Sequence, residues 1–191
     1  MHRKKLPIIL EKEEAQKLLN APSKTCFTGR RNRTIIAVML TCGLRVSEII
    51  NLAPTDVDLK YDRLRVLRSK RDKDRWLAIP TILWDQLNEW DKERPRSDWY
   101  FPTMIGGPLC RRYIEQAIGR YAKKAGIGKN VTPHTLRHTY ATEFYRQTHD
   151  IETLRRILGH ESITTTTIYL TLANEDVQQR MKDFRGYGSA V

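Results

Sequence analysis

The segment Thr132 to His138 reads Thr-Pro-His-Thr-Leu-Arg-His and carries side chains well suited to chemistry. Pro133 fits the first turn of a helix, and His134, Arg137 and His138 then share one face, because residues three and four apart are neighbours on a helix. That face offers imidazoles that can exchange protons and a guanidinium whose charge is fixed.

Two other segments offer groups of the same kind. Gly43-Leu44-Arg45-Val46-Ser47-Glu48 predicts an arginine at a helix start with an acid one turn later. Ile157-Leu158-Gly159-His160 predicts a helix ended by glycine and followed by a histidine, and Tyr169 lies nine residues further on. Taken singly, each has a plain structural explanation, since Arg45 fits a surface position and a lone tyrosine is usually packed against the core.

In this order, the motifs resemble the tyrosine recombinase (phage integrase) family, and the match runs from about Leu6 to the end. They are Gly-Leu-Arg-Val-Ser-Glu, a hairpin lysine, His-x-Leu-Arg-His, Leu-Gly-His and the tyrosine. The resemblance implies the catalytic-domain fold of that family, and a site-specific recombinase that cleaves and rejoins DNA through a covalent 3'-phosphotyrosine intermediate. It implies catalytic roles for Arg45, Lys70, His134, Arg137, His160 and Tyr169.

Two further positions match the family, and one departs from it. Glu48 matches an acid that members often hold one turn after the first arginine, and His138 matches a common second histidine; both are expected to support the chemistry. Family members often bracket the hairpin lysine with glycines, whereas this chain reads Ser69-Lys70-Arg71. The turn could therefore be less flexible than usual, and Lys73 is a rival for the role of Lys70.

The chemistry explains why these residue types are needed. Transfer of a phosphodiester to a tyrosine builds negative charge on the non-bridging oxygens, so preorganised cations should dominate catalysis. Arg45 and Arg137 suit this role because a guanidinium presents a planar fork that matches two phosphate oxygens. The phenol of a tyrosine ordinarily keeps its proton at neutral pH, so Tyr169 needs nearby cations or a base during attack.

The proton transfers can be assigned as hypotheses. His134 is the candidate base and His160 the candidate hydrogen-bond donor to a phosphate oxygen, with a sharing of the two roles as the alternative. Lys70 is the candidate acid for the leaving sugar oxygen. Tyr140 and Tyr145 are rival nucleophiles, although the apolar pattern around Tyr140 favours core packing. The four threonines that precede Tyr169 are poor helix formers, which favours a nucleophile segment able to shift.

The charge balance predicts a polyanionic partner. The 191 residues include 34 Lys plus Arg against 22 Asp plus Glu, a net charge of +12. Basic residues run from Arg3 to Arg185 instead of gathering on one amphipathic helix, which favours double-stranded DNA over a membrane surface. The N-terminus lacks the apolar core of a signal peptide, and the longest apolar run, Ile35 to Leu40, is too short to span a bilayer. We therefore expect a cytoplasmic, nucleoid-associated protein.

Neither a metal nor another cofactor is expected. Arginines can supply the charge that Mg²⁺ supplies in kinases and nucleases, and the chain has no phosphate-binding Gly-Lys-Ser/Thr loop. His134 and His138 stand four apart, as in some zinc sites, but Thr135 stands where the protease motif has glutamate. The three cysteines have neither zinc nor disulfide spacing, and we expect them to be small packing residues.

Hydrophobic periodicity predicts a mainly α-helical domain with a small antiparallel β-sheet. Two strands, 63–67 and 76–79, flank a charged turn, and Gly43 is the expected end of the second helix. Helices are expected at about 11–19, 32–42, 46–52, from 82 onward, 111–125, 133–146, 151–158, 162–170 and 175–184.

We expect residues 1–191 to form one catalytic domain, with 1–9 as a basic arm and without the family's N-terminal core-binding domain. The resemblance to the family implies a DNA-bound tetramer in which protomers exchange a C-terminal element. The segment 172–191 carries Val177, Met181 and Phe184 as an apolar stripe, which could pack on a neighbour in this way or equally well on its own domain. Two alternatives stay open: type IB topoisomerase-like relaxation of DNA, and a DNA-binding regulator without catalysis.

Overall fold

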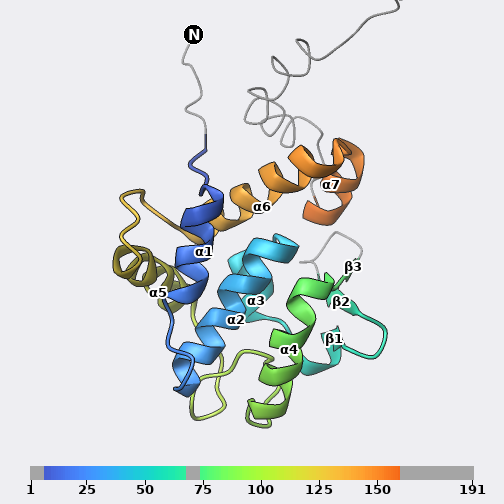
Figure 1. Cartoon of the computed structure of the whole chain (residues 1–191). Helices are drawn as coiled ribbons and strands as arrows, with labels where there is room; N and C mark the ends of the chain where they lie inside the picture. The colour runs from blue at the N-terminus through green and yellow to red at the C-terminus, as the bar shows by residue number, and fades with distance from the viewer. Residues whose placement is uncertain (1–6, 68–73, 160–191) are drawn as a thin grey trace, which may run out of the picture. The chain divides into compact units, whose positions relative to one another are not determined.

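The computed structural model describes residues 7–67 and 74–159 (Figure 1). Contacts divide them into two units, residues 7–140 and 141–159. The predicted fold class, mainly α-helical with a small antiparallel sheet, is confirmed. The helices of the larger unit are α1 (Lys12–Asn20), α2 (Phe27–Cys42), α3 (Val46–Ile50), α4 (Thr81–Glu93), α5 (Arg111–Lys124) and the first half of α6 (Pro133–Thr148).

Helix α2 is the centre of the larger unit, where it contacts α1, α4 and α5 (Figure 1). Five consecutive residues, 35–39, are buried, so α2 is covered on several sides and not along a single stripe only. The helix begins at Phe27, earlier than the expected 32–42, and so includes Gly29. This central position fixes the C-terminal end of α2, from which the candidate site is built.

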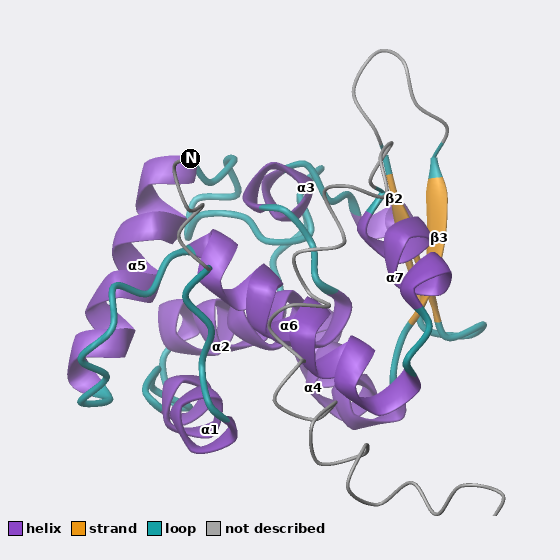
Figure 2. Cartoon of the chain, turned by 90° about the horizontal axis from the view of Figure 1, so that it is seen from above, coloured by secondary structure: helices purple, strands orange, loops and turns teal. Residues whose placement is uncertain are grey.

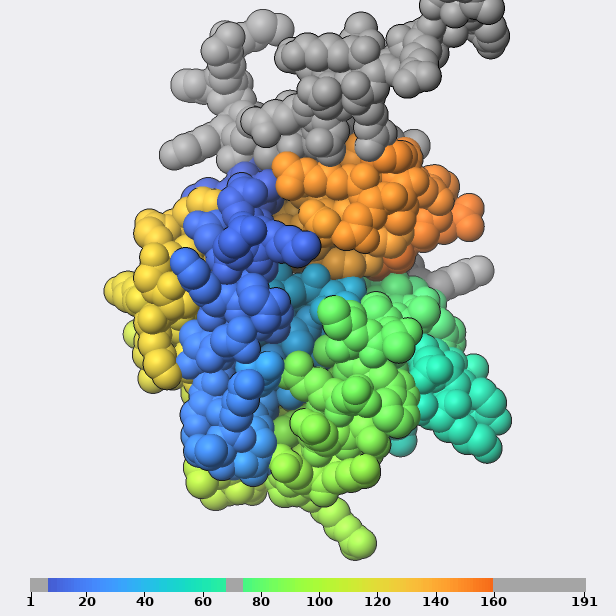
Figure 3. All heavy atoms as spheres, in the orientation of Figure 1, coloured from blue at the N-terminus to red at the C-terminus, as the bar shows by residue number. Residues whose placement is uncertain are grey.

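Helix α4 closes one side of the core. Leu83, Leu87 and Trp90 recur at helical spacing and are buried. The Trp90 indole stacks on Phe101 at a ring-centroid distance of 6.0 Å and donates from Nε1 to the carbonyl oxygen of Tyr100 at 3.0 Å. In Figure 3 this face of the larger unit is covered by α4 (green) beside the N-terminal helices (blue).

The sheet has three antiparallel strands in the order β1 (Val57–Asp58), β2 (Arg63–Val66) and β3 (Arg75–Ala78). It lies at the opposite side of the larger unit from α5 (Figures 1 and 2). Leu64 and Leu77 are partners across β2 and β3 and are buried. Both predicted strands are confirmed to within a residue at each end, whereas β1 was missed because two residues give no detectable alternation.

The smaller unit contains the second half of α6 and α7 (Ile151–Leu158). Helix α7 has the predicted bounds: the Asp150 carboxylate accepts from the Thr153 N–H at 2.8 Å at its start, and Gly159, with φ of 63°, follows its end. The helices expected at 162–170 and 175–184, and the segment 172–191, lie outside the described residues. No helix in the described part of the chain has the length and apolar character needed to cross a membrane.

Candidate active site

A glycine turn between α2 and α3 sets the geometry of the candidate site. Gly43 has φ of 66° and ψ of 24°, and its N–H donates to the carbonyl oxygen of Met39 at 3.2 Å, which ends α2 as the sequence predicts. The chain then needs only Leu44, a buried residue, before it reaches the start of the next helix. Arg45 is therefore placed at the start of α3 by a turn that the core holds in place.

Arg45 and Glu48 are joined twice across the first turn of α3. The Glu48 carboxylate accepts from the Arg45 backbone N–H at 2.7 Å and from Arg45 Nη1 at 3.1 Å. The first bond is the usual role of a glutamate three residues after a helix cap. The second holds one edge of the guanidinium while 38% of the Arg45 side chain stays exposed. An anion in solution can therefore reach Arg45.

Arg137 approaches the same place from α6. That helix begins at Pro133, where Thr132 and Thr135 cap each other through their backbone N–H groups and hydroxyls. One turn later, Arg137 Nη1 donates to the carbonyl oxygen of Gly43 at 2.6 Å and lies 3.9 Å from Glu48 Oε2. Only 6% of the Arg137 side chain is exposed. Gly43 and Arg137, 94 positions apart in the sequence, are thus brought together.

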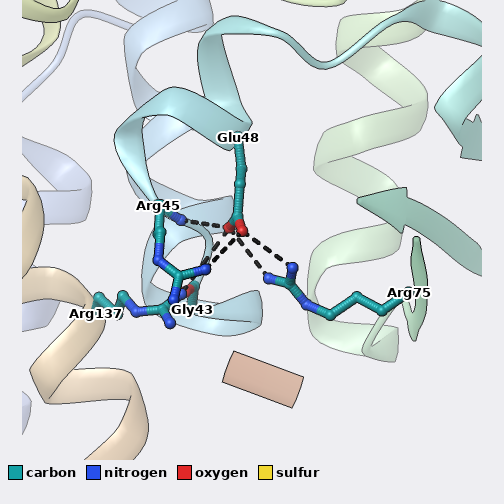
Figure 4. Close-up of polar contacts among 5 residues, drawn as sticks. All are labelled: Gly43, Arg45, Glu48, Arg75 and Arg137. Atoms are coloured by element: carbon teal, nitrogen blue, oxygen red, sulfur yellow. Dashed lines mark hydrogen bonds and ion pairs between the residues drawn. The ribbon is translucent and has the colours of Figure 1, made fainter. Parts of the chain in front are cut away.

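Arg75 is a third guanidinium at this site, and sequence reasoning gave it no role. It begins β3 and forms two hydrogen bonds with Glu48, from Nη1 to Oε1 at 3.0 Å and from Nη2 to Oε2 at 3.1 Å. Figure 4 shows guanidinium groups from three elements around the one carboxylate. The sequence does contain a signal for this position. Arg75 alternates with Leu77 and Ile79, which places its side chain on the buried face of the strand, where a charged residue needs a partner.

Glu48 is ionised in this setting. Burial alone would raise the pKa of this carboxyl, but the hydrogen bonds and charge of Arg75, the Arg45 N–H and the charge of Arg137 together lower the pKa below its ordinary value. Within the described part of the chain, three cations around one anion leave an excess of positive charge, and this excess suits a phosphate. Glu48 thus lies among the guanidinium groups, and its supporting role in the chemistry stays a prediction.

The two histidines of α6 differ in their surroundings. His134 is exposed and His138 is half-buried, and their ring centroids lie 6.5 Å apart. Burial lowers the pKa of His138, and the charges of His134 and Arg137 lower it further, so His138 is neutral at neutral pH. His134 stands one turn before Arg137 on the helix and is open to solvent. Of the pair, only His134 combines exposure with a position one turn from a site arginine.

Tyr140 packs against the turn of the site. An added Cβ at Gly43 would meet Cδ1 and Cε1 of the Tyr140 ring, so this ring lies directly on the turn. Burial raises the pKa of the Tyr140 hydroxyl, and nearby Cys42 raises it further. A hydroxyl that keeps its proton this firmly is a poor nucleophile. Cys42 is buried as expected, whereas Cys26 and Cys110 are exposed, so packing does not explain those two cysteines.

Several predicted site residues cannot be placed. Lys70, its rival Lys73, His160 and Tyr169 lie outside the described residues. Of the six predicted catalytic residues, the described part of the chain contains Arg45, Arg137 and His134, and it brings Arg45 and Arg137 together around Glu48. Their catalytic roles remain predictions.

Comparison with known proteins supports the resemblance. The model of the phage integrase family matches residues 9–176. Tyrosine recombinase XerD of Staphylococcus epidermidis is 33% identical over 190 residues, covering 96% of this chain and 64% of the relative. Tyrosine recombinase XerD of Pseudomonas putida is 34% identical over 184 residues, covering 92% of this chain and 61% of the relative. The chain thus spans less than two thirds of the length of these relatives.

Two solved structures share the fold. The crystal structure of XerA recombinase superposes with a TM-score of 0.83 at 32% identity, covering 97% of this chain and 68% of that one. The XerH site-specific recombinase, bound to a palindromic difH substrate in a post-cleavage complex, gives a TM-score of 0.80 at 28% identity, covering 93% of this chain and 53% of that one. With the family model spanning most of its length, the chain belongs to the phage integrase family.

Proposed function

We propose that residues 1–191 act as the catalytic domain of a site-specific tyrosine recombinase, which cleaves and rejoins double-stranded DNA through a 3'-phosphotyrosine at Tyr169. The observation that supports this most is the arrangement of Arg45 and Arg137. Two guanidinium groups from distant segments meet at one turn, held by Gly43 and Glu48. Their preorganised charge favours the phosphoryl-transfer transition state over any reaction of a neutral substrate.

The remaining catalytic residues complete a reaction that needs no metal or ATP. Tyr169 attacks the phosphorus, and His134 takes the phenolic proton. Lys70 protonates the sugar oxygen that leaves, and His160 donates a hydrogen bond to a non-bridging oxygen. The bond energy is kept in the phosphotyrosine, so the reverse attack by a sugar hydroxyl rejoins the strand.

Double-stranded DNA is the proposed substrate and partner. The net charge of +12 favours a polyanion, and the similar XerH structure contains its difH substrate. We propose that the protein works as a tetramer on DNA, in which the segment 172–191 packs on a neighbouring protomer. Such a reaction would take place on the nucleoid, in the cytoplasm.

The test is trapping of a covalent protein–DNA adduct. Nicked duplexes with a randomised core, which let the cut end diffuse away, are incubated with the protein, and the adducts that survive denaturation are sequenced. We expect wild-type protein to enrich one core sequence and Tyr169→Phe to bind that duplex without forming an adduct. Tyr140→Phe is the matched control and should still form the adduct, because its ring packs on Gly43.

The outcomes separate the candidate functions. An adduct with exchange of strands between two duplexes supports the recombinase. An adduct with relaxation of supercoiled DNA but no exchange would mean topoisomerase-like activity instead. Binding of DNA without any adduct would leave a regulator, and an adduct that persists in Tyr169→Phe would overturn the assignment of the nucleophile.

A further inference from the structure

The Glu48 carboxylate is shared unequally among its three cations. Arg75 takes both oxygens at 3.0 and 3.1 Å, Arg45 shares Oε1 at 3.1 Å, and Arg137 Nη1 is 3.9 Å from Oε2. Arg75 is therefore the principal ion-pair partner, although it is not one of the residues to which the proposed chemistry assigns a step.

Burial strengthens the ion pair between Arg75 and Glu48. The Arg75 and Glu48 side chains are 10% and 7% exposed, so water does little to weaken the attraction between them. The Arg45 side chain, at 38%, is the open member of the cluster. A phosphate that approaches from solvent would therefore meet Arg45, while Arg75 stays behind it against the carboxylate.

The role of Arg75 follows from what Glu48 would do without it. The carboxylate must stay near Arg45, because it also accepts from the Arg45 backbone N–H. With Arg75 removed, Arg45 and Arg137 would be the cations left beside the Glu48 carboxylate among the described residues, and the carboxylate would compete with a phosphate for both guanidinium groups. Within the described residues the Arg45 side chain hydrogen-bonds only to Glu48, so its position depends on where that carboxylate lies.

We propose, given the proposed function, that Arg75 is a positioning residue: it neutralises and orients Glu48 and so leaves the charge of Arg45 and Arg137 available to a DNA phosphate. The residue acts through Glu48 and need not touch DNA. Because Arg75 begins β3, five positions after Lys70, it also ties the base of the hairpin to the arginine pair.

The same sheet supplies a matched control. Arg65 on β2 is paired with a buried acid as well, donating from Nε to Asp56 Oδ1 at 2.8 Å, and Asp56 is 1% exposed. Arg65 faces Trp76 across the strands, and Trp76 is 51% exposed, so this ion pair lies on the opposite face of the sheet from Arg75. Loss of the Arg65 side chain should therefore leave the site unchanged.

The experiment compares Arg75→Met, Arg75→Lys, Glu48→Gln and the double variant Arg75→Met/Glu48→Gln with Arg65→Met. Adduct formation in a single turnover and affinity for the selected duplex are measured for each full chain. We expect Arg75→Met to lower the adduct rate by about 10²-fold, with affinity changed by about threefold or less. Arg75→Lys, which keeps the charge but loses the two-pronged bond, should fall between Arg75→Met and wild type.

The double variant is the decisive member. The double variant should form the adduct at least about tenfold faster than Arg75→Met, because the Glu48 carboxylate no longer competes with the phosphate for Arg45 and Arg137. A purely structural role predicts no such recovery. If Arg75→Met unfolds in a thermal melt, the double variant is compared with Glu48→Gln instead. Once the carboxylate is gone, loss of Arg75 should lower the adduct rate by no more than about threefold.

Two results would overturn the inference: Arg75→Met with the rate of Arg65→Met, or a double variant no faster than Arg75→Met. Either result leaves the recombinase proposal intact, because wild-type protein still forms the adduct. Absence of the wild-type adduct is a separate failure, that of the proposed function.

Discussion

Arg137 Nη1 donates a 2.6 Å hydrogen bond to the carbonyl oxygen of Gly43. This bond joins the start of α6 to the turn that ends α2, and the same turn leads into Arg45. A charged donor on a backbone carbonyl is among the stronger hydrogen bonds in proteins. The spacing of the two site arginines therefore depends on one glycine turn, and this dependence can be tested from both sides.

Arg137→Lys should lower the rate of adduct formation by about 10²-fold or more. An ammonium cannot keep the bond to Gly43, stay near Glu48 and present a planar fork to two phosphate oxygens at once. The measurement is a single-turnover time course on the selected nicked duplex, with a binding assay beside it. A lysine variant that cleaves at nearly the wild-type rate would refute the role of Arg137.

Gly43→Ala should destabilise the larger unit by about 2 kcal/mol or more. The φ of 66° is costly for an L residue, and the new Cβ would meet the Tyr140 ring, with Cε1 at 2.7 Å. Urea unfolding at neutral pH measures the change.

Gly119→Ala is the control for that substitution. Gly119 lies within α5, and apart from its chain neighbours and the backbone of its own helix, no atom lies within 4 Å of a Cβ added there. Alanine is the better helix former, so this variant should be about 0.5–1 kcal/mol more stable than wild type. Equal effects of the two alanines on stability would contradict the strain assigned to Gly43.

The ion pair of Glu48 should make stability depend on acid pH. Its pKa is lower in the folded chain than the ordinary 4.5, so its contribution is complete above about pH 4.5 and is lost as pH falls through the folded pKa. Glu48→Gln should cost about 3 kcal/mol at pH 7 because a buried anion beside Arg75 and Arg137 is lost. Unfolding by urea between pH 7 and pH 3 should show a flatter pH dependence for Glu48→Gln than for wild type; parallel curves would argue against this contribution.

His138 should titrate below the ordinary histidine value of 6.5, because burial and the charges of His134 and Arg137 all disfavour its protonated form. The unfolded chain then binds a proton more readily than the folded one. Stability should accordingly fall as pH drops below 6.5 and level off below the folded pKa. An NMR titration of the ring protons tests the direction, and a midpoint above 6.5 would show that the imidazolium is stabilised in the folded chain.

The limits of sequence reasoning show at particular residues. The alternation of Leu64 with Val66 and of Leu77 with Ile79 predicts β2 and β3, but β1 is too short for any pattern to detect. The expected range 32–42 misses the first turn of α2, which begins at Phe27, because contacts with α1, α4 and α5 stabilise this helix as a whole and no local pattern shows them. Helix stops were more predictable, since Gly43 and Gly159 carry their own conformational signal.

The sequence by itself determined the family and the fold class, because the order of the motifs and the hydrophobic periodicity are properties of the linear sequence and do not depend on how the chain folds. It also singled out Arg45, Arg137 and His134 as candidates for chemistry. Only the tertiary structure decided that Arg45 and Arg137 meet at the carbonyl of Gly43 and the carboxylate of Glu48, and that Arg75 occupies both oxygens of that carboxylate. The physical reason is that an ion pair between residues 27 positions apart depends on the packing of a strand against a helix turn, and no local pattern encodes that distance.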